Sequence, residues 1–266
     1  MRRFKWNQIT FHIVLKDTMH KFYILFLLLF AVEWATAQEY HGTTGLLRVP
    51  CAETAEAGTF RGYMNVLSKH FTPDQQRFEG SKYHTFSYGV GIAFFSWLEI
   101  SYSASLLKFH KNGQKDKEVG YFNEDRRVNF KLRPIKEGPW WPAVAVGMDD
   151  VGRFDRIAEG DNGNNYYQNI YFALSKHFDV KGSELGVHAD YVYYTTKANK
   201  DRRGVVGGLT LRPSFFRPLR FVAEYDTQSV NVGADALLWR HLFLQACLVD
   251  GRSITAGIGY HYRIPY

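Results

Sequence analysis

Charged side chains recur at alternate positions inside runs of otherwise apolar residues. Within residues 127–133, basic residues occupy most of one phase of the alternation, and aliphatic or aromatic residues occupy the other. If the apolar phase faces lipid, the polar phase lines the interior of a barrel. The charged residues that such an interior would receive are Arg127, Lys131, Arg133, His188, Asp190, Arg212, Arg220, Glu224, Asp226, His261 and Arg263.

Two kinds of chemistry fit this set. It predicts either a polar, mildly basic passage or binding surface for a glycan, with arginine pairing to sugar carboxylates, or a network of salt bridges that fills a narrow barrel.

A second candidate is the pair Ser175 and His177, which lie two residues apart and so share one face of a strand. This spacing would allow a nucleophilic serine like that of outer-membrane lipid hydrolases. No orienting acid is evident, however, and the segment also fits a strand end with interfacial anchors.

Acidic residues gather near the middle of the chain and could offer hard oxygen ligands to Ca²⁺. The spacing of an EF-hand is absent, and a solvated acidic loop explains the same residues. They are Asp149, Asp150, Asp155, Glu159 and Asp161.

No phosphate-binding loop, dinucleotide fingerprint or zinc-type Cys/His spacing occurs, so we expect no cofactor, no metal ligand and no catalytic residue. Cys51 and Cys247 are the two cysteines. They can pair in an oxidising compartment or remain two thiols.

Strict alternation of apolar and polar residues repeats in about twelve segments, and no helical stripe is visible after the first 37 residues. Most of these runs have nine to thirteen residues, which suits membrane-crossing strands better than the shorter strands of a soluble sandwich. Short turns alternate with long polar connections, among them 110–124 and 151–165. The prediction is an all-β fold, an antiparallel up-and-down transmembrane β-barrel of about twelve strands. The runs are 59–71, 83–95, 98–106, 127–133, 142–150, 166–178, 184–193, 203–213, 218–227, 230–236, 241–250 and 253–264.

Aromatic residues crowd the ends of these runs, where they would form girdles at the lipid headgroups. The final run ends in Tyr266, and a closed barrel must seal its first strand to its last because lipid leaves an open edge unpaired. The expected girdle residues are Phe94, Phe95, Trp97, Trp140, Trp141, Tyr166, Tyr167, Tyr193, Tyr194 and Trp239.

The beginning of the chain has the features of a signal peptide. An apolar run at 22–32 is followed by Ala35-Thr36-Ala37, a small-residue cleavage pattern. We expect a signal peptide over 1–37, with Met19 as a possible true start, a lead-in or plug segment over 38–58, and the barrel over 59–266. The net charge of +7 falls to about +4 without the leader, which is too mild to indicate nucleic acid.

Four motifs follow one another along the chain, "GTTGLLRVPCAETAEAGTFRGY", "WLEISY", "PAVAVGMDDVG" and "FALSKHF". In type and order they resemble the motifs of the YjbH/GfcD family of exopolysaccharide-associated outer-membrane proteins. The chain lacks the family's Gly-Thr-Gly after the aspartate. The positions that carry the resemblance are Gly45, Leu46, Leu47, Pro50, Ala52, Gly58 and Asp150.

This resemblance implies a non-enzymatic role in export or surface assembly of a polysaccharide or capsule. The expected partners are outer-membrane lipid, the polysaccharide, periplasmic export proteins and the barrel-assembly machinery, in the outer membrane of a Gram-negative bacterium. The alternatives are an outer-membrane lipid hydrolase using Ser175 and a secreted β-sandwich that binds glycans.

Overall fold

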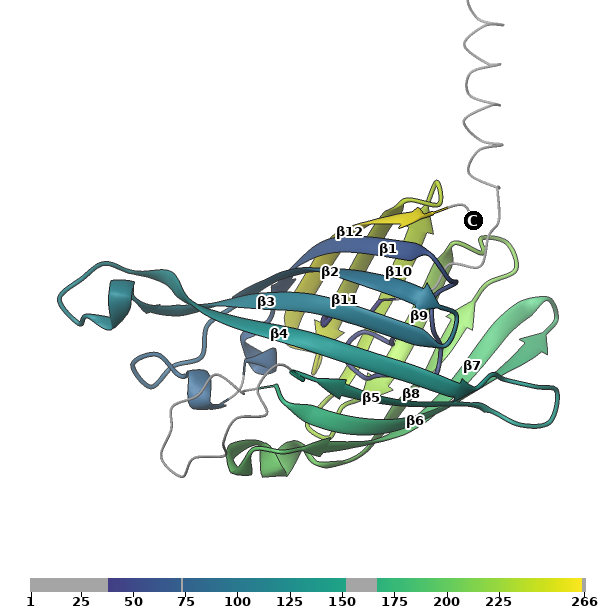
Figure 1. Ribbon diagram of the computed structural model, residues 1–266, viewed down its shortest axis with the longest axis horizontal. Helices are drawn as coiled ribbons and strands as arrows, with labels where there is room; N and C mark the ends of the chain where they lie inside the picture. The colour runs from purple at the N-terminus through teal and green to yellow at the C-terminus, as the bar shows by residue number, and fades with distance from the viewer. Residues whose placement is uncertain (1–37, 73, 152–166, 265–266) are drawn as a thin grey trace, which may run out of the picture.

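The computed structural model describes residues 38–72, 74–151 and 167–264 and forms a closed antiparallel barrel (Figure 1). Each strand pairs with its neighbour in sequence, and the last strand pairs with the first. The strands are β1 (Thr59–Leu67), β2 (Thr85–Phe95), β3 (Leu98–His110), β4 (Val119–Ile135), β5 (Ala143–Asp149), β6 (Asn169–Val180), β7 (Ser183–Tyr194), β8 (Gly204–Arg212), β9 (Leu219–Tyr225), β10 (Val230–Leu238), β11 (Leu242–Val249) and β12 (Ser253–Arg263).

The seam between β1 and β12 closes the sheet, as predicted. Eight residue pairs join the two strands, from Thr59 opposite Arg263 to Val66 opposite Ala256. Closure removes the free edge that lipid cannot solvate and excludes the alternative of a two-sheet sandwich. Tyr266, the aromatic end of the final run, lies outside the described residues.

The predicted runs match the strands to within three residues at each end, except for three runs. The run at 59–71 stops at Leu67, and a 3₁₀ helix, η1 (Lys69–Phe71), follows it. β3 and β4 are longer than predicted and extend as a two-stranded ribbon with η3 (Lys111–Gly113) at its tip (Figure 1). Residues 119–124, predicted as loop, therefore belong to a strand. Water contacts both faces of this ribbon, so its sequence does not need to alternate between apolar and polar residues and shows no such alternation.

Burial in this barrel is inverted relative to a soluble protein. In β1, Arg61 and Asn65 are buried, whereas Met64 is 61% exposed. The apolar phase thus faces outward and the polar phase inward along the strands, which is the arrangement of a barrel in an outer membrane. Among the described residues, no helix is long and apolar enough to cross a bilayer.

The aromatic residues at strand ends are mostly exposed, which fits interfacial girdles. Trp140 is 91% exposed, and Phe95 stacks on Trp97 with ring centroids 5.0 Å apart. Tyr167 was expected in a girdle, but it is buried with Arg127 over its ring. Tyr194 is only partly exposed, and Tyr166 lies outside the described residues.

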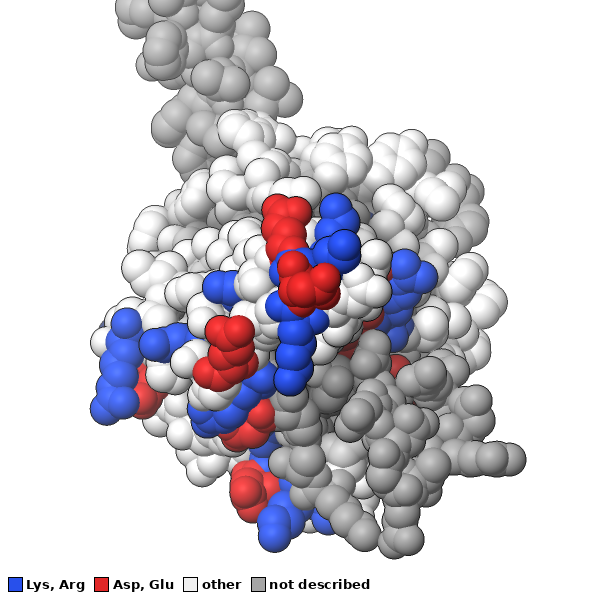
Figure 2. All heavy atoms as spheres, turned by 90° about the vertical axis from the view of Figure 1, so that its left-hand side faces the viewer, with Lys and Arg blue, Asp and Glu red and all other residues white. Residues whose placement is uncertain are grey.

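The two ends of the barrel differ. The connections after β1, β3, β5 and β7 are long, whereas those after β2 and β6 are two residues each. Long loops are typical of the extracellular side of such barrels and short turns of the periplasmic side. We call these the long-loop end and the short-turn end. Figure 2 looks onto the long-loop end, where acidic and basic side chains lie side by side.

Because the apolar phase faces outward, a charged substitution in it should lower the unfolding free energy most in the middle of the membrane. Met64→Arg, in the middle of β1, should lower the unfolding free energy by about 2–4 kcal/mol, because the guanidinium would face hydrocarbon. Urea unfolding in lipid vesicles, followed by the heat-dependent gel shift of folded barrels, measures this. Val119→Arg, on the outer ribbon, is the matched control and should cost about 0–1 kcal/mol. Equal losses for the two variants would contradict the placement of the apolar phase against lipid.

Candidate functional site

Residues 38–58, which we call the plug, lie inside the barrel. Gln38 bonds His261 on β12 near the short-turn end, Arg48 reaches Asp226 beyond β9 at the long-loop end, and Gly58 leads into β1. The segment therefore enters and leaves the lumen at the same end. Between these points the segment makes a tight loop that includes Arg48, with Leu46 and Val49 paired through their backbones and Gly45 bridged to Pro50.

Apolar side chains of the plug fill the space left by small residues of the wall. Leu46 and Leu47 are fully buried. A Cβ added at Gly208 would come within 2.9 Å of Leu46 Cδ1, and one at Gly233 within 3.0 Å of Leu47 Cδ1. The same added atoms would lie still closer to neighbouring strands, at 2.4 Å from the Ala223 carbonyl oxygen and 2.3 Å from that of Ala246, so these glycines serve both the sheet and the close approach of the plug.

Glu224 on β9 binds the turn of the plug. Its carboxylate accepts hydrogen bonds from the backbone N–H groups of Leu47, Arg48 and Val49, at 3.0 to 3.2 Å. Beside it, the Arg48 guanidinium donates to Asp226 at 2.7 Å and lies over the ring of Phe71. Burial lowers the pKa of Arg48, but the adjacent Asp226 outweighs it and holds the pKa above its usual value.

Glu99 on β3 binds the opposite side of the plug. It accepts from the Thr44 backbone N–H at 2.8 Å and from the Ala55 N–H at 2.5 Å, and it pairs with Arg61 at 3.1 Å. Lys131 donates to the Thr44 carbonyl at 2.6 Å. Glu99 and Lys131 are therefore both bonded to plug backbone.

Arg220, also on β9, is a further charged wall residue that bonds to the plug backbone. It pairs with Asp235 at 2.7 Å and donates to the carbonyls of Gly45 and Leu46 at 3.0 and 3.2 Å. Charged groups of the wall thus bond to plug carbonyls as well as to plug N–H groups, so each supplies partners for part of the other's buried polar atoms.

The residues predicted to face the interior fall into two groups. Asp226 aside, the set predicted to face the interior has ten members, and eight of them are buried. Of the other two, Arg133 is partly exposed and Arg263 lies at the short-turn rim beside Glu56. The buried eight are Arg127, Lys131, His188, Asp190, Arg212, Arg220, Glu224 and His261. Asp226 is buried too.

Sequence reasoning missed four charged residues of the barrel wall, Arg61, Glu99, Asp125 and Asp235. All four lie in the polar phase of their strands and are buried. The signal that could have identified them is the same alternation that identified Arg127, extended two residues back to 125 and applied to 59–67, 98–106 and 230–236.

Ser175 and His177, the pair suggested by spacing, do not contact each other. The Ser175 hydroxyl instead lies 2.8 Å from His188 Nδ1 and accepts from the Ala52 N–H, inside the lumen. His177 lies between two carboxylates, Glu53 at 2.8 Å from Nε2 and Glu137 at 2.7 Å from Nδ1. Burial raises the pKa of Glu53, but the hydrogen bond from His177 and the neighbouring His188, His177 and Arg220 charges together outweigh burial and hold the pKa below its usual range.

The acidic residues considered for Ca²⁺ are only partly described. Asp149 is buried and accepts from the Asn169 amide at 2.9 Å, and the Asp150 N–H donates to Asn129. Asp155, Glu159 and Asp161 lie outside the described residues. The two cysteines, Cys51 and Cys247, are free and buried, and burial raises the pKa of the Cys51 thiol to about 12.

The positions that carry the family resemblance lie mostly in the plug. Gly45, Leu46, Leu47, Pro50 and Ala52 are buried there. Gly58 has φ of +79° where the chain turns into β1, and Asp150 has φ of +62° after β5. The motif thus encodes the segment that occupies the lumen.

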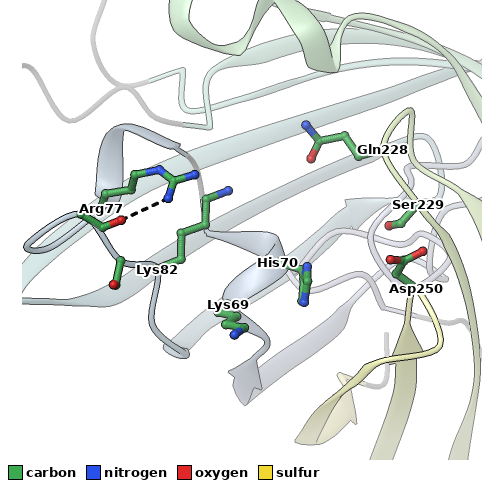
Figure 3. Close-up of a pocket in the computed structure, with 9 residues that line it drawn as sticks. Lys69, His70, Arg77, Lys82, Gln228, Ser229 and Asp250 are labelled. Carbon is green, nitrogen blue, oxygen red and sulfur yellow. Dashed lines mark hydrogen bonds between the residues drawn. The ribbon is translucent and has the colours of Figure 1, made fainter.

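A basic depression of about 420 Å³ opens at the long-loop end (Figure 3). The connection between β1 and β2 supplies four basic residues, and the β9–β10 and β11–β12 turns supply the opposite wall. Asp74 partly neutralises the positive charge of the depression, because its carboxylate pairs with Arg77 at 2.8 Å and with Lys82 at 3.2 Å. The labelled residues of the depression are Lys69, His70, Arg77, Lys82, Gln228, Ser229 and Asp250.

The role of Glu224 can be tested through Cys51, which is fully buried. In a Cys247→Ser background, Cys51 is the single thiol. Glu224→Ala leaves three plug N–H groups without their acceptor, at about 1–3 kcal/mol each. Maleimide labelling of Cys51 in the folded barrel should therefore accelerate at least about tenfold.

The control is Glu184→Ala, which removes a rim carboxylate that pairs with Arg212. This variant should label as slowly as the parent. Equal rates for the Glu224 and Glu184 variants would show that the carboxylate on β9 does not retain the plug.

Comparison with known proteins gives distant structural neighbours and a family. No curated protein matches the chain. An outer membrane phospholipase (OMPLA) dimer with bound calcium from Salmonella typhi is 12% identical, with a TM-score of 0.35 over 79% of this chain and 92% of that one. The Escherichia coli outer membrane phospholipase A is also 12% identical, with a TM-score of 0.33 over 79% of this chain and 98% of that one. The sequence model of the YjbH family, described as exopolysaccharide biosynthesis protein YbjH, matches residues 37–264, and this chain belongs to that family.

Proposed function

We propose that this outer-membrane barrel is a non-enzymatic component of exopolysaccharide or capsule export or surface assembly. The observation that carries the proposal is membership of the exopolysaccharide family across the plug and the whole barrel. The expected partners are the polysaccharide and periplasmic export proteins.

In this proposal, the plug in the lumen limits where a polysaccharide can contact the barrel. The plug bonds to wall residues on β3 and β4 and, across the lumen, on β9. In this conformation a polysaccharide would be contacted at the mouths of the barrel, and passage through it would require displacement of the plug.

The basic depression supplies a surface suited to an acidic glycan. Lysine and arginine side chains pair with carboxylates in charge-assisted hydrogen bonds. Gln228 and Ser229 on the opposite wall add neutral groups that can bond sugar hydroxyls. We infer that the bound class is a polysaccharide carrying carboxylates or other anionic substituents.

The hydrolase alternative receives less support from the geometry. Ser175 is 1% exposed, and its hydroxyl is bonded to Ala52 and His188 in the lumen. A serine that attacks lipid must be reached by an acyl group. We therefore expect no labelling of Ser175 by serine-directed phosphonates.

The first test is genetic. Deleting the gene in the producing bacterium should lower secreted or surface polysaccharide severalfold, and the intact gene should restore it. Total polysaccharide inside and outside the cell distinguishes export from synthesis. Unchanged secretion in the deletion strain would overturn the proposal.

The depression is tested separately by binding. Replacing Lys69, Arg77 and Lys82 by alanine should weaken binding of the purified barrel to the strain's acidic polysaccharide at least about tenfold, since each charge-assisted contact contributes about 1.5–3 kcal/mol. Calorimetry in detergent at low salt measures the change.

Its control removes three lysines at the same end of the barrel. Lys111, Lys115 and Lys117 are exposed on the β3–β4 ribbon, and their replacement by alanine should leave affinity within about twofold. If both triple variants lose affinity equally, binding reflects general charge and the depression is not the site.

A further inference from the structure

Four side chains able to bind a metal converge where the plug returns towards the short-turn end. Atoms of Cys51, Glu53 and His188 that could act as ligands lie within 4.8 Å of one another. His177 adjoins them, because its Nε2 is 2.8 Å from Glu53 Oε1 and its ring centroid is 5.5 Å from that of His188.

Thiolate, carboxylate and imidazole are the ligands that Zn²⁺ takes in proteins, usually four in a tetrahedron. Zinc bonds of about 2.0–2.3 Å place neighbouring ligand atoms roughly 3.3–3.7 Å apart. His188 Nε2 and Glu53 Oε1 are 4.0 Å apart. The ligand atoms of Cys51, Glu53 and His188 must contract by about 1 Å at their widest separation, and the Glu53 side chain, 20% exposed, has freedom to move.

Each histidine is already held through its other ring nitrogen. His188 Nδ1 lies 2.8 Å from the Ser175 hydroxyl, and His177 Nδ1 lies 2.7 Å from Glu137 Oε2. Zinc-binding histidines almost always have such a partner, which fixes the ring and directs its free nitrogen at the metal. The Nε2 atoms of both rings face Glu53.

The backbone leaves room for the two rings. A Cβ at Gly186 would lie 2.2 Å from Thr210 Oγ1, 2.8 Å from His188 Nε2 and 3.0 Å from His177 Cδ2. Glycine at this position of β7 permits the approach of both imidazoles. The remaining polar neighbour is the Thr210 hydroxyl, 3.2 Å from His188 Nε2.

We propose that Cys51, Glu53, His177 and His188 form a Zn²⁺ site that fastens the plug to β6 and β7. On binding, Cys51 loses its thiol proton and His177 loses the Nε2 proton that it shares with Glu53, so two protons leave. The thiolate and the carboxylate balance the two charges of the ion, and both imidazoles are neutral. Two ligands come from the plug and two from the wall, so the ion links the two parts.

The test uses the full-length barrel purified in detergent and stripped with a chelator. After addition of ZnCl₂ and desalting, about one zinc ion per chain should remain by mass spectrometry. Co²⁺ added in its place should give the thiolate-to-metal charge-transfer absorption of a tetrahedral cysteine site. Absence of this absorption from the unaltered protein would overturn the proposal, whatever any variant does.

Variants then assign the ligands, with the heat-dependent gel shift confirming that each is folded. Cys51→Ser and His188→Asn should lose zinc retention and the cobalt absorption. Cys247→Ser, which removes the other buried thiol, should keep both. Ser175→Ala keeps every ligand and should weaken zinc affinity about 10–100-fold through loss of the partner of His188. Zinc retention by Cys51→Ser equal to that of the unaltered protein would exclude this site.

Discussion

This structure depends on one constraint: charged side chains buried in the lumen and backbone groups of the plug must serve as hydrogen-bond partners for one another. A barrel with apolar residues outside has its charged residues inside, and a charge removed from water needs a partner. A segment without regular structure in the lumen has unpaired N–H and C=O groups that need partners equally. Glu224, Glu99 and Arg220 meet both needs, because each binds plug backbone.

The same constraint explains why an irregular chain is tolerated at membrane depth. Backbone outside helices and sheets is stable there only where protein or water surrounds it. The leucines of the plug add apolar contact against wall glycines and alanines. The wall is consequently specialised, with small residues where the plug is apolar and charged residues where its backbone turns.

The strands could be predicted from the sequence because lipid on one side and polar contacts on the other impose a period of two. Each strand carries that pattern within a short stretch, so the twelve runs coincide with twelve strands. The pattern fails where that asymmetry ends, as in the β3–β4 ribbon. It also fails for Tyr167, whose partner Arg127 lies 40 positions earlier in the chain.

The site was less predictable for the same physical reason. Alternation shows that Glu224 faces inward, but not that its partner is the turn at Leu47, 177 residues away. Likewise, Cys51 and Glu53 lie more than 120 residues from His177. No short motif can encode such a cluster, since barrel closure brings its members together.

The path of the plug has a mechanical consequence. Gln38 and Gly58 lie towards the same end of the barrel, and Arg48 is at the far end. The segment is therefore a doubled loop, not a thread, and no chain end needs to travel the length of the lumen for it to withdraw. A pulling force applied from the short-turn side would load the bonds that join the plug backbone to Glu224, Glu99, Arg220 and Lys131.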